Sequence, residues 1–272
     1  MGHLIKTYIV DAFTDKPFNG NPAGVCLIEK DLDDALMISI AGELGLSETA
    51  FVKKFDEPNR YFIRYFSPKM EIPLCGHATL AASEVLFRRE VSLHKINFVN
   101  IQNIHLLVEK VGGSIKMEFP VYETKPDKAP QKLLNALGIE ILQNVEFNEE
   151  TKILLIEIDD SQFLNQMKPD FQALYDSHKN INGVLVTAPS NKKEYDFESR
   201  YFWPWSGTNE DPVTGATHTF LTKYWSKRLG KTKMKSFQCS KRTGFMEVEL
   251  EDKNRLIIKS AAKIIFEGGL ML

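Results

Sequence analysis

Three side chains that can give or take a proton lie beside two glycines in this sequence. Cys75 and His77 flank Gly76, and Asp211 lies shortly before Gly215. Each glycine opens a segment that is expected to be helical, and the start of a helix presents unpaired backbone N–H groups with a partial positive charge. Because glycine has no side chain, a ligand can approach the backbone closely there. The pattern predicts a cradle for a small anionic substrate such as a carboxylate.

A fourth candidate, Glu48, is a lone carboxylate in the largely apolar run Leu-Ser-Glu-Thr-Ala-Phe at 46–51. Apolar neighbours disfavour the charged form of a carboxylate, so we expect the pKa of Glu48 to be raised towards the working pH of an acid–base catalyst. Each candidate also has a purely structural interpretation. Glu48 fits an exposed strand edge, and Cys75 fits a small core residue. His77 fits a cap or a packed imidazole, and Asp211 fits a turn or an N-cap.

A short sequence block occurs twice and divides the chain into halves. Arg-Tyr-Phe-Ser-Pro at 64–68 returns as Arg-Tyr-Phe-Trp-Pro at 200–204, an offset of 136 in a chain of 272 residues. Each copy leads to a second block, Pro-Leu-Cys-Gly at 73–76 and Pro-Val-Thr-Gly at 212–215. Two blocks in the same order predict two related halves, with the substrate buried between them. Two unrelated strand–turn–helix units are the alternative.

The predicted elements agree with two α+β halves. Helices are expected at 33–44, 76–88 and 216–229, and the second is small and apolar around much of its circumference, which suits a helix enclosed by strands. Alternating or β-branched residues predict strands at 5–12, 49–55, 61–66, 104–109, 114–119, 152–158, 184–188, 199–203, 245–250 and 255–260. The charged segment 122–130 contains two prolines and is predicted to be a linker. We expect domains at 1–121 and 131–272, with the last strand a candidate to return to the first domain.

Composition limits the classes of function. The residues are 43% hydrophobic and 26% charged with a net charge of −2, so nothing favours nucleic acid or an anionic membrane as a partner. The sequence has no apolar stretch of about 18 residues and no secretory signal at its start. Cys26, Cys75 and Cys239 are too widely spaced for a disulfide framework or a zinc knuckle. A cytoplasmic location is therefore expected.

Four motifs together resemble one protein family. They are Asn-Gly-Asn-Pro-Ala-Gly at 19–24, Leu-Ser-Glu-Thr-Ala-Phe at 46–51, Phe-Ser-Pro at 66–68 with Glu-Ile-Pro-Leu-Cys-Gly-His-Ala-Thr-Leu at 71–80, and Glu-Asp-Pro-Val-Thr-Gly at 210–215. They are similar to the PhzF-like proteins of phenazine biosynthesis, within the wider diaminopimelate-epimerase-like fold, and the resemblance runs from about Ile5 to Leu270. It implies an α+β fold of two pseudo-symmetric domains, each a β-barrel-like sheet around a central helix, with the active site in the cleft between them.

The resemblance also implies roles for individual residues. Glu48 would be the acid/base that moves a proton between two carbons of a small carboxylate-bearing substrate, and His77 and Asp211 would hold and polarise that substrate. Substrate contacts are implied for Asn21, Cys75, Gly76, Thr214, Gly215 and Ala216. Ala216 stands where the family usually has a serine, which puts the identity of the substrate in doubt. The implied enzyme is a homodimeric isomerase that works without a cofactor or a metal.

Two other functions stay open. In the epimerase branch of the fold two cysteines face the substrate, but Cys75 aligns with Thr214, whose hydroxyl is a far weaker acid than a thiol. An epimerase or racemase that uses Glu48 with Cys75 is conceivable, and so is a non-catalytic binding protein that keeps the fold. A cysteine hydrolase is disfavoured, because Cys75 and His77 are two residues apart at a helix start and have no evident partner. No His-x-x-x-His spacing suggests a catalytic metal, and no glycine-rich phosphate loop suggests a nucleotide.

Overall fold

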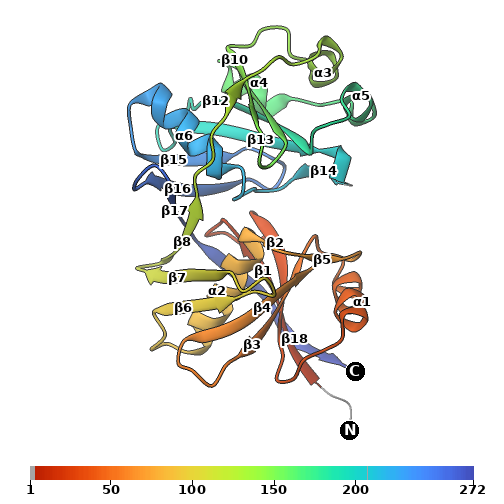
Figure 1. The fold of residues 1–272 in the computed structure, drawn as a ribbon, viewed down its shortest axis with the longest axis vertical. Helices are drawn as coiled ribbons and strands as arrows, with labels where there is room; N and C mark the ends of the chain where they lie inside the picture. The colour runs from red at the N-terminus through yellow and green to blue at the C-terminus, as the bar shows by residue number, and fades with distance from the viewer. Residues whose placement is uncertain (1–3, 207) are drawn as a thin grey trace. The chain divides into compact units, whose positions relative to one another are not determined.

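The computed structural model describes residues 4–206 and 208–272, and the chain divides into two compact units (Figure 1). Unit 1 contains the described residues up to Glu118 together with Ile258–Leu272, and unit 2 contains Phe119–Ile257. The C-terminal segment thus belongs to the same unit as the start of the chain. Among the described residues, no helix is both long enough and apolar enough to cross a membrane.

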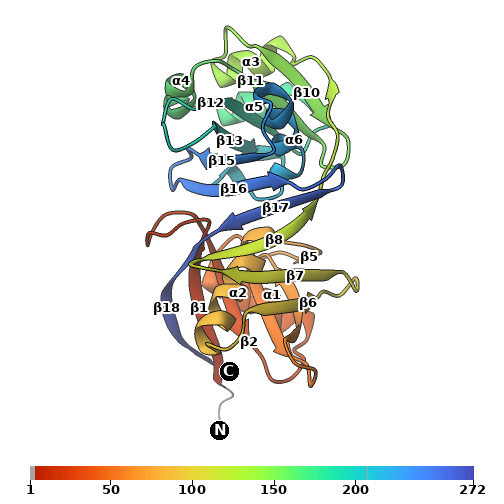
Figure 2. The same cartoon turned by 90° about the vertical axis from the view of Figure 1, so that its left-hand side faces the viewer.

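Unit 1 contains one run of paired strands. In spatial order these are β18 (Ala262–Met271), β1 (Leu4–Ala12), β2 (Asn21–Leu27), β3 (Thr49–Lys54), β4 (Arg60–Phe66), β6 (Lys95–Val99), β7 (His105–Val111) and β8 (Ser114–Pro120). The pairs β2–β3 and β4–β6 are parallel and the others are antiparallel. A two-residue strand, β5 (Glu71–Ile72), also pairs with β4. Strand β18 runs along β1 in both views (Figures 1 and 2).

The helices of unit 1 lie in the crossovers that parallel strands require. Helix α1 (Asp34–Leu44) connects β2 to β3; the Asp33 side chain accepts a hydrogen bond from the Leu36 N–H (2.7 Å), and Gly45 ends the helix with a left-handed backbone. Helix α2 (Gly76–Arg89) precedes β6 and is buried over most of its circumference against β1, β2, β3 and β18. The prediction of a helix enclosed by strands is confirmed.

Unit 2 repeats this order of pairing. Its strands are β9 (Lys125–Pro126), β10 (Asn144–Asn148), β11 (Ile153–Glu157), β12 (Gly183–Pro189), β13 (Phe197–Trp203), β15 (Lys233–Gln238), β16 (Gly244–Leu250) and the first half of β17 (Arg255–Ser260), with β14 (Thr208–Asp211) as a branch on β13. The pairs β11–β12 and β13–β15 are parallel, as β2–β3 and β4–β6 are in unit 1. Their crossovers contain α4 (Ser161–Gln166), α5 (Phe171–Ser177) and α6 (His218–Leu229), and α3 (Gln131–Leu137) precedes β10. The chain therefore has an α+β fold of two pseudo-symmetric units.

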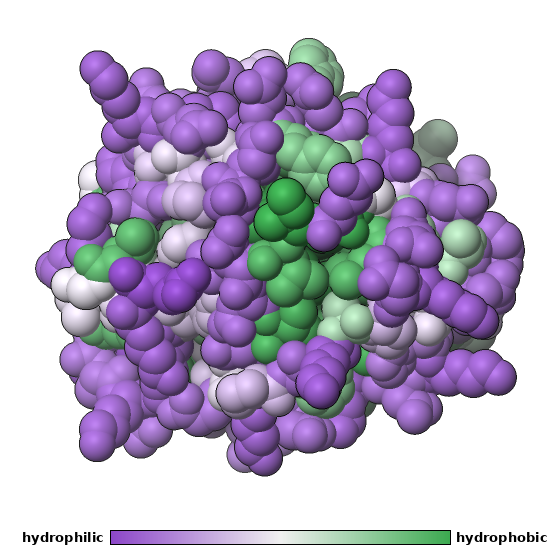
Figure 3. Space-filling view, turned by 90° about the horizontal axis from the view of Figure 1, so that it is seen from above, coloured by the Kyte–Doolittle hydropathy of each residue, from purple (hydrophilic) through white to green (hydrophobic). Residues whose placement is uncertain are grey.

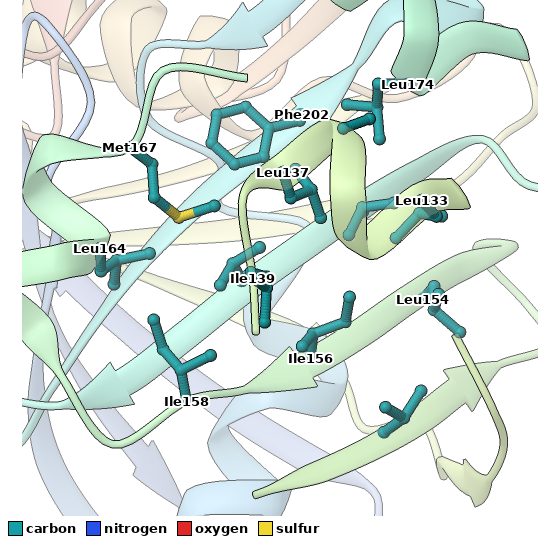
Figure 4. Close-up of a cluster of buried hydrophobic side chains, with 14 of the residues drawn as sticks. Leu133, Leu137, Ile139, Leu154, Ile156, Ile158, Leu164, Met167, Leu174 and Phe202 are labelled. Carbon is teal, nitrogen blue, oxygen red and sulfur yellow. The ribbon is translucent and has the colours of Figure 1, made fainter. Parts of the chain in front are cut away.

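A large hydrophobic cluster fills unit 2 between its short helices and its central strands. Helices α3, α4 and α5 contribute Leu133, Leu164 and Leu174, which point towards side chains of β11 and β13 such as Ile156 and Phe202 (Figure 4). All five are almost fully buried. Truncating one such side chain to alanine typically costs about 2–5 kcal/mol. This cluster holds β13, and with it the Pro-x-x-Gly block that follows.

Polar residues cover much of the surface seen in Figure 3, around a central hydrophobic strip.

The repeated Arg-Tyr-Phe block forms the same ion pair in both units. Arg64 on β4 binds both carboxylate oxygens of Glu71 on β5, at 2.8 and 2.7 Å. Arg200 on β13 binds Glu210 on β14 in the same way, at 2.7 and 2.9 Å. Each guanidinium also lies 4.9 Å from the ring of the phenylalanine two residues further along. These bidentate clasps fix the short arm that leads into each Pro-x-x-Gly block.

Some sequence expectations differ from the structure. Segment 122–130, expected to be a linker, contains β9, whose Lys125 and Pro126 pair with Phe147 and Glu146 of β10. Strands β2, β6, β10, β15 and β18 were not among the predicted strands. Helix α6 begins at His218 rather than at residue 216, because the preceding residues form a turn with hydrogen bonds between residues three apart.

Candidate active site

Unit 1 brings Glu48, Cys75 and His77 into one cluster. Glu48 immediately precedes β3, and its backbone carbonyl accepts a hydrogen bond from Gly24 N–H of β2 (3.1 Å). Cys75 is the N-cap of α2, and His77 is in its first turn. His77 Nε2 lies 3.1 Å from Glu48 Oε2, and His77 Nδ1 lies 3.4 Å from Cys75 Sγ. One imidazole thus bridges the carboxylate and the thiol.

The cluster is an ion pair in its resting state. The side chains of His77 and Glu48 are only 11% and 13% exposed. Burial acts to lower the pKa of His77, but its interactions with Cys75 and Glu48 outweigh burial and hold that pKa well above 6.5. A charged imidazolium donates from both ring nitrogens, so Nε2–H is directed to the carboxylate and Nδ1–H to the sulfur.

The expected direction of the Glu48 pKa shift is wrong. Burial does favour the neutral carboxyl and is the largest single effect, as the apolar neighbours predict. The hydrogen bond and charge of His77, with a hydrogen bond from Ser47, together outweigh it and lower the pKa below 4.5. The sequence shows the apolar neighbours but not the histidine that folds against the carboxylate. Glu48 is therefore ionised at neutral pH.

Residues outside the motif stabilise the turn before α2. Thr79 Oγ1 donates to the Cys75 carbonyl (2.7 Å) and shares a hydrogen bond with the Tyr65 hydroxyl (2.6 Å). Asn100 Nδ2 donates to the Pro73 carbonyl (2.8 Å). These supporting residues were missed from the sequence, although Tyr65 belongs to the repeated block and could have been found there. Nothing in the sequence around Asn100, which lies in the turn after β6, indicated this supporting role.

Unit 2 brings Asp211 and Thr214 together. The Thr214 hydroxyl donates a hydrogen bond to the Asp211 carboxylate. Gln238 on β15 supports both residues, because its Nε2 donates to the Asp211 carbonyl (2.7 Å) and its Oε1 accepts from Thr214 N–H (2.9 Å). Gln238 was also missed, since nothing in its local sequence distinguishes it from other strand residues. Asp211 is thus held by hydrogen bonds at both its carboxylate and its backbone carbonyl.

The other predicted contact residues lie at the edges of these clusters. Gly76 is the first residue of α2, next to Cys75, and Asn21 is a buried residue that begins β2 opposite Ala12. Gly215 and Ala216 lie in the turn between Thr214 and α6. Their substrate contacts stay predictions.

His218, expected to be packed or on the surface, is fully buried at the start of α6. Burial lowers its pKa to about 4, so the imidazole is neutral at physiological pH. Nδ1 lies 3.1 Å from the Thr214 carbonyl and must donate to it, which leaves Nε2 to accept from Ser236 Oγ at 2.8 Å. His218 is a structural residue.

Comparison with known proteins identifies the family. The family model described as phenazine biosynthesis-like protein (PhzC-PhzF) matches residues 10–268. The chain belongs to this family. It is 40% identical to phenazine biosynthesis-like domain-containing protein 2 of Mus musculus, over 98% of this chain and 99% of that protein. It is also 40% identical to an uncharacterized isomerase of Pseudomonas aeruginosa, again over 98% of this chain and 99% of the relative.

Solved structures agree with this assignment. A PhzF-family protein of Enterococcus faecalis superposes with a TM-score of 0.91 at 37% identity, covering 99% of this chain and all of the other. A probable proline racemase of Agrobacterium radiobacter has the same fold at 10% identity, with a TM-score of 0.63 over 98% and 93% of the two chains. The diaminopimelate-epimerase-like fold is thereby established.

Proposed function

We propose that this chain is a cofactor-independent isomerase that moves a proton on a small carboxylate-bearing substrate, with Glu48 and His77 as its acid–base pair. The observation that carries the proposal is the ion pair between His77 Nε2 and Glu48 Oε2, 3.1 Å apart and largely shielded from water at the start of α2. A carboxylate of lowered pKa beside an imidazolium is ready to take a proton and to return it.

The proposed reaction needs no external electron carrier. The Glu48 carboxylate takes a proton from a carbon next to an electron-withdrawing group, and the electron pair of the broken C–H bond delocalises into that group. Glu48 then returns the proton to a second carbon, where a new C–H bond forms as the π electrons shift. His77 stays hydrogen-bonded to Glu48 throughout and offsets its charge, so the site does not contain a buried carboxylate with an uncompensated charge.

The start of α2 is proposed to hold the substrate carboxylate. Among the described residues, the N-cap Cys75 makes no side-chain hydrogen bond to the helix, so the first-turn N–H groups beginning at Gly76 have no capping acceptor there. An anion at a helix start gains about 0.3–1 kcal/mol at an exposed site and up to about 2 kcal/mol when partly buried. That modest energy serves mainly to orient the substrate beside Glu48.

Asp211 is proposed to act in the same reaction as a substrate-holding group. The Thr214 hydroxyl and Gln238 fix the position of the aspartate from two sides, which suits a group that binds without moving a proton. Gly215 and Ala216 are proposed to offer backbone N–H groups, and Ala216 removes the hydroxyl that the family usually places there. We therefore expect the substrate to have no polar group at the position that this hydroxyl would otherwise contact. Asn21 is proposed as a further contact.

The test is incorporation of deuterium from solvent into a panel of small unsaturated and amino carboxylates, followed by mass spectrometry and NMR. Wild-type protein should exchange or isomerise at least one member, and Glu48→Gln should lose that activity. Glu43→Gln is the matched control, because Glu43 is an exposed glutamate five residues earlier. Full exchange by Glu48→Gln would exclude the assignment of the base.

A single-carbon epimerase is the second candidate, favoured by the 3.4 Å separation of Cys75 Sγ and His77 Nδ1. In that reaction Glu48 and Cys75 would exchange protons on one carbon, so a single enantiomer would racemise in deuterated water with label at that carbon alone. An isomerase would label a different carbon from the one that lost its proton. Tight binding of a carboxylate without any exchange would instead favour a non-catalytic binding protein.

We also propose that the chain forms a homodimer, as the family resemblance implies. Sedimentation at micromolar concentration measures this directly. A single species of 31.0 kDa, the mass of one chain, would contradict it.

A further inference from the structure

We infer that Glu48, Cys75 and His77 form a binding site for one soft divalent metal ion, with Zn²⁺ the preferred ion, and that occupancy of this site blocks the acid–base pair. Metal binding is independent of the proposed function, and only the inhibitory consequence rests on it. Among the described residues, these three offer one ligand atom each within 4.8 Å of one another, and they are the one such group of three or more.

The separations of the ligand atoms match a tetrahedral ion. Bond lengths of about 2.3 Å to sulfur and about 2.0–2.2 Å to nitrogen or oxygen require ligand atoms roughly 3.3–3.6 Å apart. His77 Nε2 lies 3.1 Å from Glu48 Oε2 and 3.9 Å from Cys75 Sγ, so the observed spacings fall on either side of that range. The third separation, between Cys75 Sγ and the Glu48 carboxylate, is no more than 4.8 Å, so side-chain rotations that move these atoms by up to about an ångström would place all three on one ion.

The charges of the three ligands fit a doubly charged ion. A thiolate and a carboxylate contribute two negative charges, and a neutral imidazole contributes none, so the occupied site is neutral. Binding releases the proton of the thiol and the extra proton of the imidazolium to solvent. The start of α2 disfavours a cation, but the effect of a helix end is much weaker than direct coordination by a thiolate, a carboxylate and an imidazole. The helix therefore weakens the site without abolishing it.

The ligand types select the ion. Sulfur and imidazole ligands favour Zn²⁺ and its borderline-soft neighbours, whereas Mg²⁺ and Ca²⁺ require mostly oxygen ligands. Three protein ligands leave one tetrahedral position for water or a substrate carboxylate. Glu48 and His77 keep 13% and 11% of their side-chain surface exposed, so solvent reaches the cluster. With the ion bound, neither Glu48 nor His77 can carry a proton to a substrate.

The other cysteines provide the matched control. Cys26 is a free, fully buried thiol in unit 1 whose recorded side-chain partner is Thr7. Burial raises the pKa of Cys26 to about 12, which disfavours the thiolate that a metal needs. Substitution of Cys26 therefore tests whether metal binding depends on any thiol of unit 1 or on Cys75 in particular.

Co²⁺ titration of the folded protein tests the inference. The wild type should bind one Co²⁺ per chain with a thiolate-to-cobalt charge-transfer band, and Zn²⁺ should displace it. Cys75→Ser should abolish the band, and His77→Asn and Glu48→Gln should each weaken binding at least tenfold. Cys26→Ser should bind as the wild type does. Circular dichroism of every variant separates loss of the site from loss of the fold.

Two results would overturn the inference: no charge-transfer band in folded wild-type protein, or equal Co²⁺ binding by wild type and Cys75→Ser. Because this readout needs no substrate, failure of the proposed isomerase would leave it unchanged. The inhibitory part is tested with any substrate found by deuterium exchange. One equivalent of Zn²⁺ should abolish exchange and a chelator should restore it, and undiminished exchange with the ion bound would contradict the block.

Discussion

The two Pro-x-x-Gly turns share hydrogen bonds but differ in chemistry. In unit 1 the Pro73 carbonyl accepts from Asn100, and in unit 2 the equivalent Pro212 carbonyl accepts from Ser240. Two residues later the Cys75 carbonyl accepts from Thr79, whereas the Thr214 carbonyl accepts from His218. Different side chains thus satisfy the same backbone groups. The backbone demands a donor at each point and accepts several residue types for it.

The reacting groups do not follow the repeat. In the sequence alignment of the two blocks, His77 of unit 1 corresponds to Ala216 of unit 2, and Asp211 of unit 2 corresponds to Ile72 of unit 1. Unit 1 therefore contains the ion pair of Glu48 and His77, and unit 2 contains an aspartate whose carboxylate accepts a hydrogen bond from the Thr214 hydroxyl. The scaffold is duplicated, whereas the proposed acid–base pair belongs to unit 1 alone.

The largest expected difference between the units is in activity. Glu48→Gln removes the base while keeping its shape, and exchange should fall about 10²- to 10⁴-fold, the usual contribution of acid–base catalysis. Asp211→Asn should act mainly by raising KM, because Asp211 is proposed to hold the substrate. Steady-state kinetics separate the two outcomes. A larger loss of kcat in Asp211→Asn than in Glu48→Gln would reverse the assigned roles.

The arginine clasps should differ in their contributions to stability. Arg200 is 9% exposed and also donates from its NH1 group to the carbonyls of Leu164 and Met167, so Arg200→Ala leaves several buried acceptors unpaired. We expect a loss of about 3–5 kcal/mol in the free energy of unfolding. Arg64 has a further partner in the exposed carboxylate of Asp34, so Arg64→Ala should cost about 1–2 kcal/mol. Urea denaturation measures both, and equal losses would show that the clasps are equivalent.

The pKa values of the two buried histidines, His77 and His218, shift in opposite directions on folding. The pKa of His218 falls to about 4 on folding, so only the unfolded chain binds its proton between pH 6.5 and 4, and stability falls as the pH drops through that window. The full loss is about 3 kcal/mol. The pKa of His77 rises on folding, so its contribution is complete below pH 6.5 and is lost as the pH rises through the folded value.

Unfolding free energies measured across this pH range distinguish the histidines. His218→Gln should remove the loss on the acid side, and His77→Asn should remove the loss on the alkaline side. His94→Asn, a change at an exposed histidine of unit 1, is the matched control variant. Glu48 adds a second acid-side loss, because its lowered pKa stabilises the folded state above pH 4.5 and less as the pH falls. If the free energy of unfolding of His218→Gln fell between pH 6.5 and pH 4 as much as that of the wild type, His218 would not be a neutral core group.

Local sequence signals predicted a large part of this fold. Asp33 and Gly45 marked the two ends of α1, and both caps are present. Strand β18 was harder, because its Gly268-Gly269 pair is typical of turns. A Cβ at Gly269 would lie 2.5 Å from Leu4 Cδ1, so a larger residue there would displace the Leu4 side chain on the paired strand β1. No local pattern contains that information.

The candidate site was predicted in composition but not in electrostatics. Its motifs named Glu48, Cys75 and His77, which the fold brings together. The sign of the Glu48 pKa shift depends on an ion pair between residues 29 positions apart, and so it could not be read from the apolar neighbours alone. The supporting residues Asn100 and Gln238 come from distant turns and strands, where short polar side chains are common.

The smallest expected difference concerns the tyrosines of the repeated block. The Tyr65 hydroxyl is fully buried and hydrogen-bonded to Thr79 Oγ1 at 2.6 Å, whereas no hydrogen bond from the Tyr201 hydroxyl is recorded within residues 4–206 and 208–272. Tyr65→Phe should therefore lower the free energy of unfolding by about 1 kcal/mol, and Tyr201→Phe by less than about 0.5 kcal/mol. Urea denaturation of both variants decides the point. Equal losses would mean that both turns depend on a tyrosine hydroxyl, and unit 2 would then resemble unit 1 more closely than its recorded hydrogen bonds indicate.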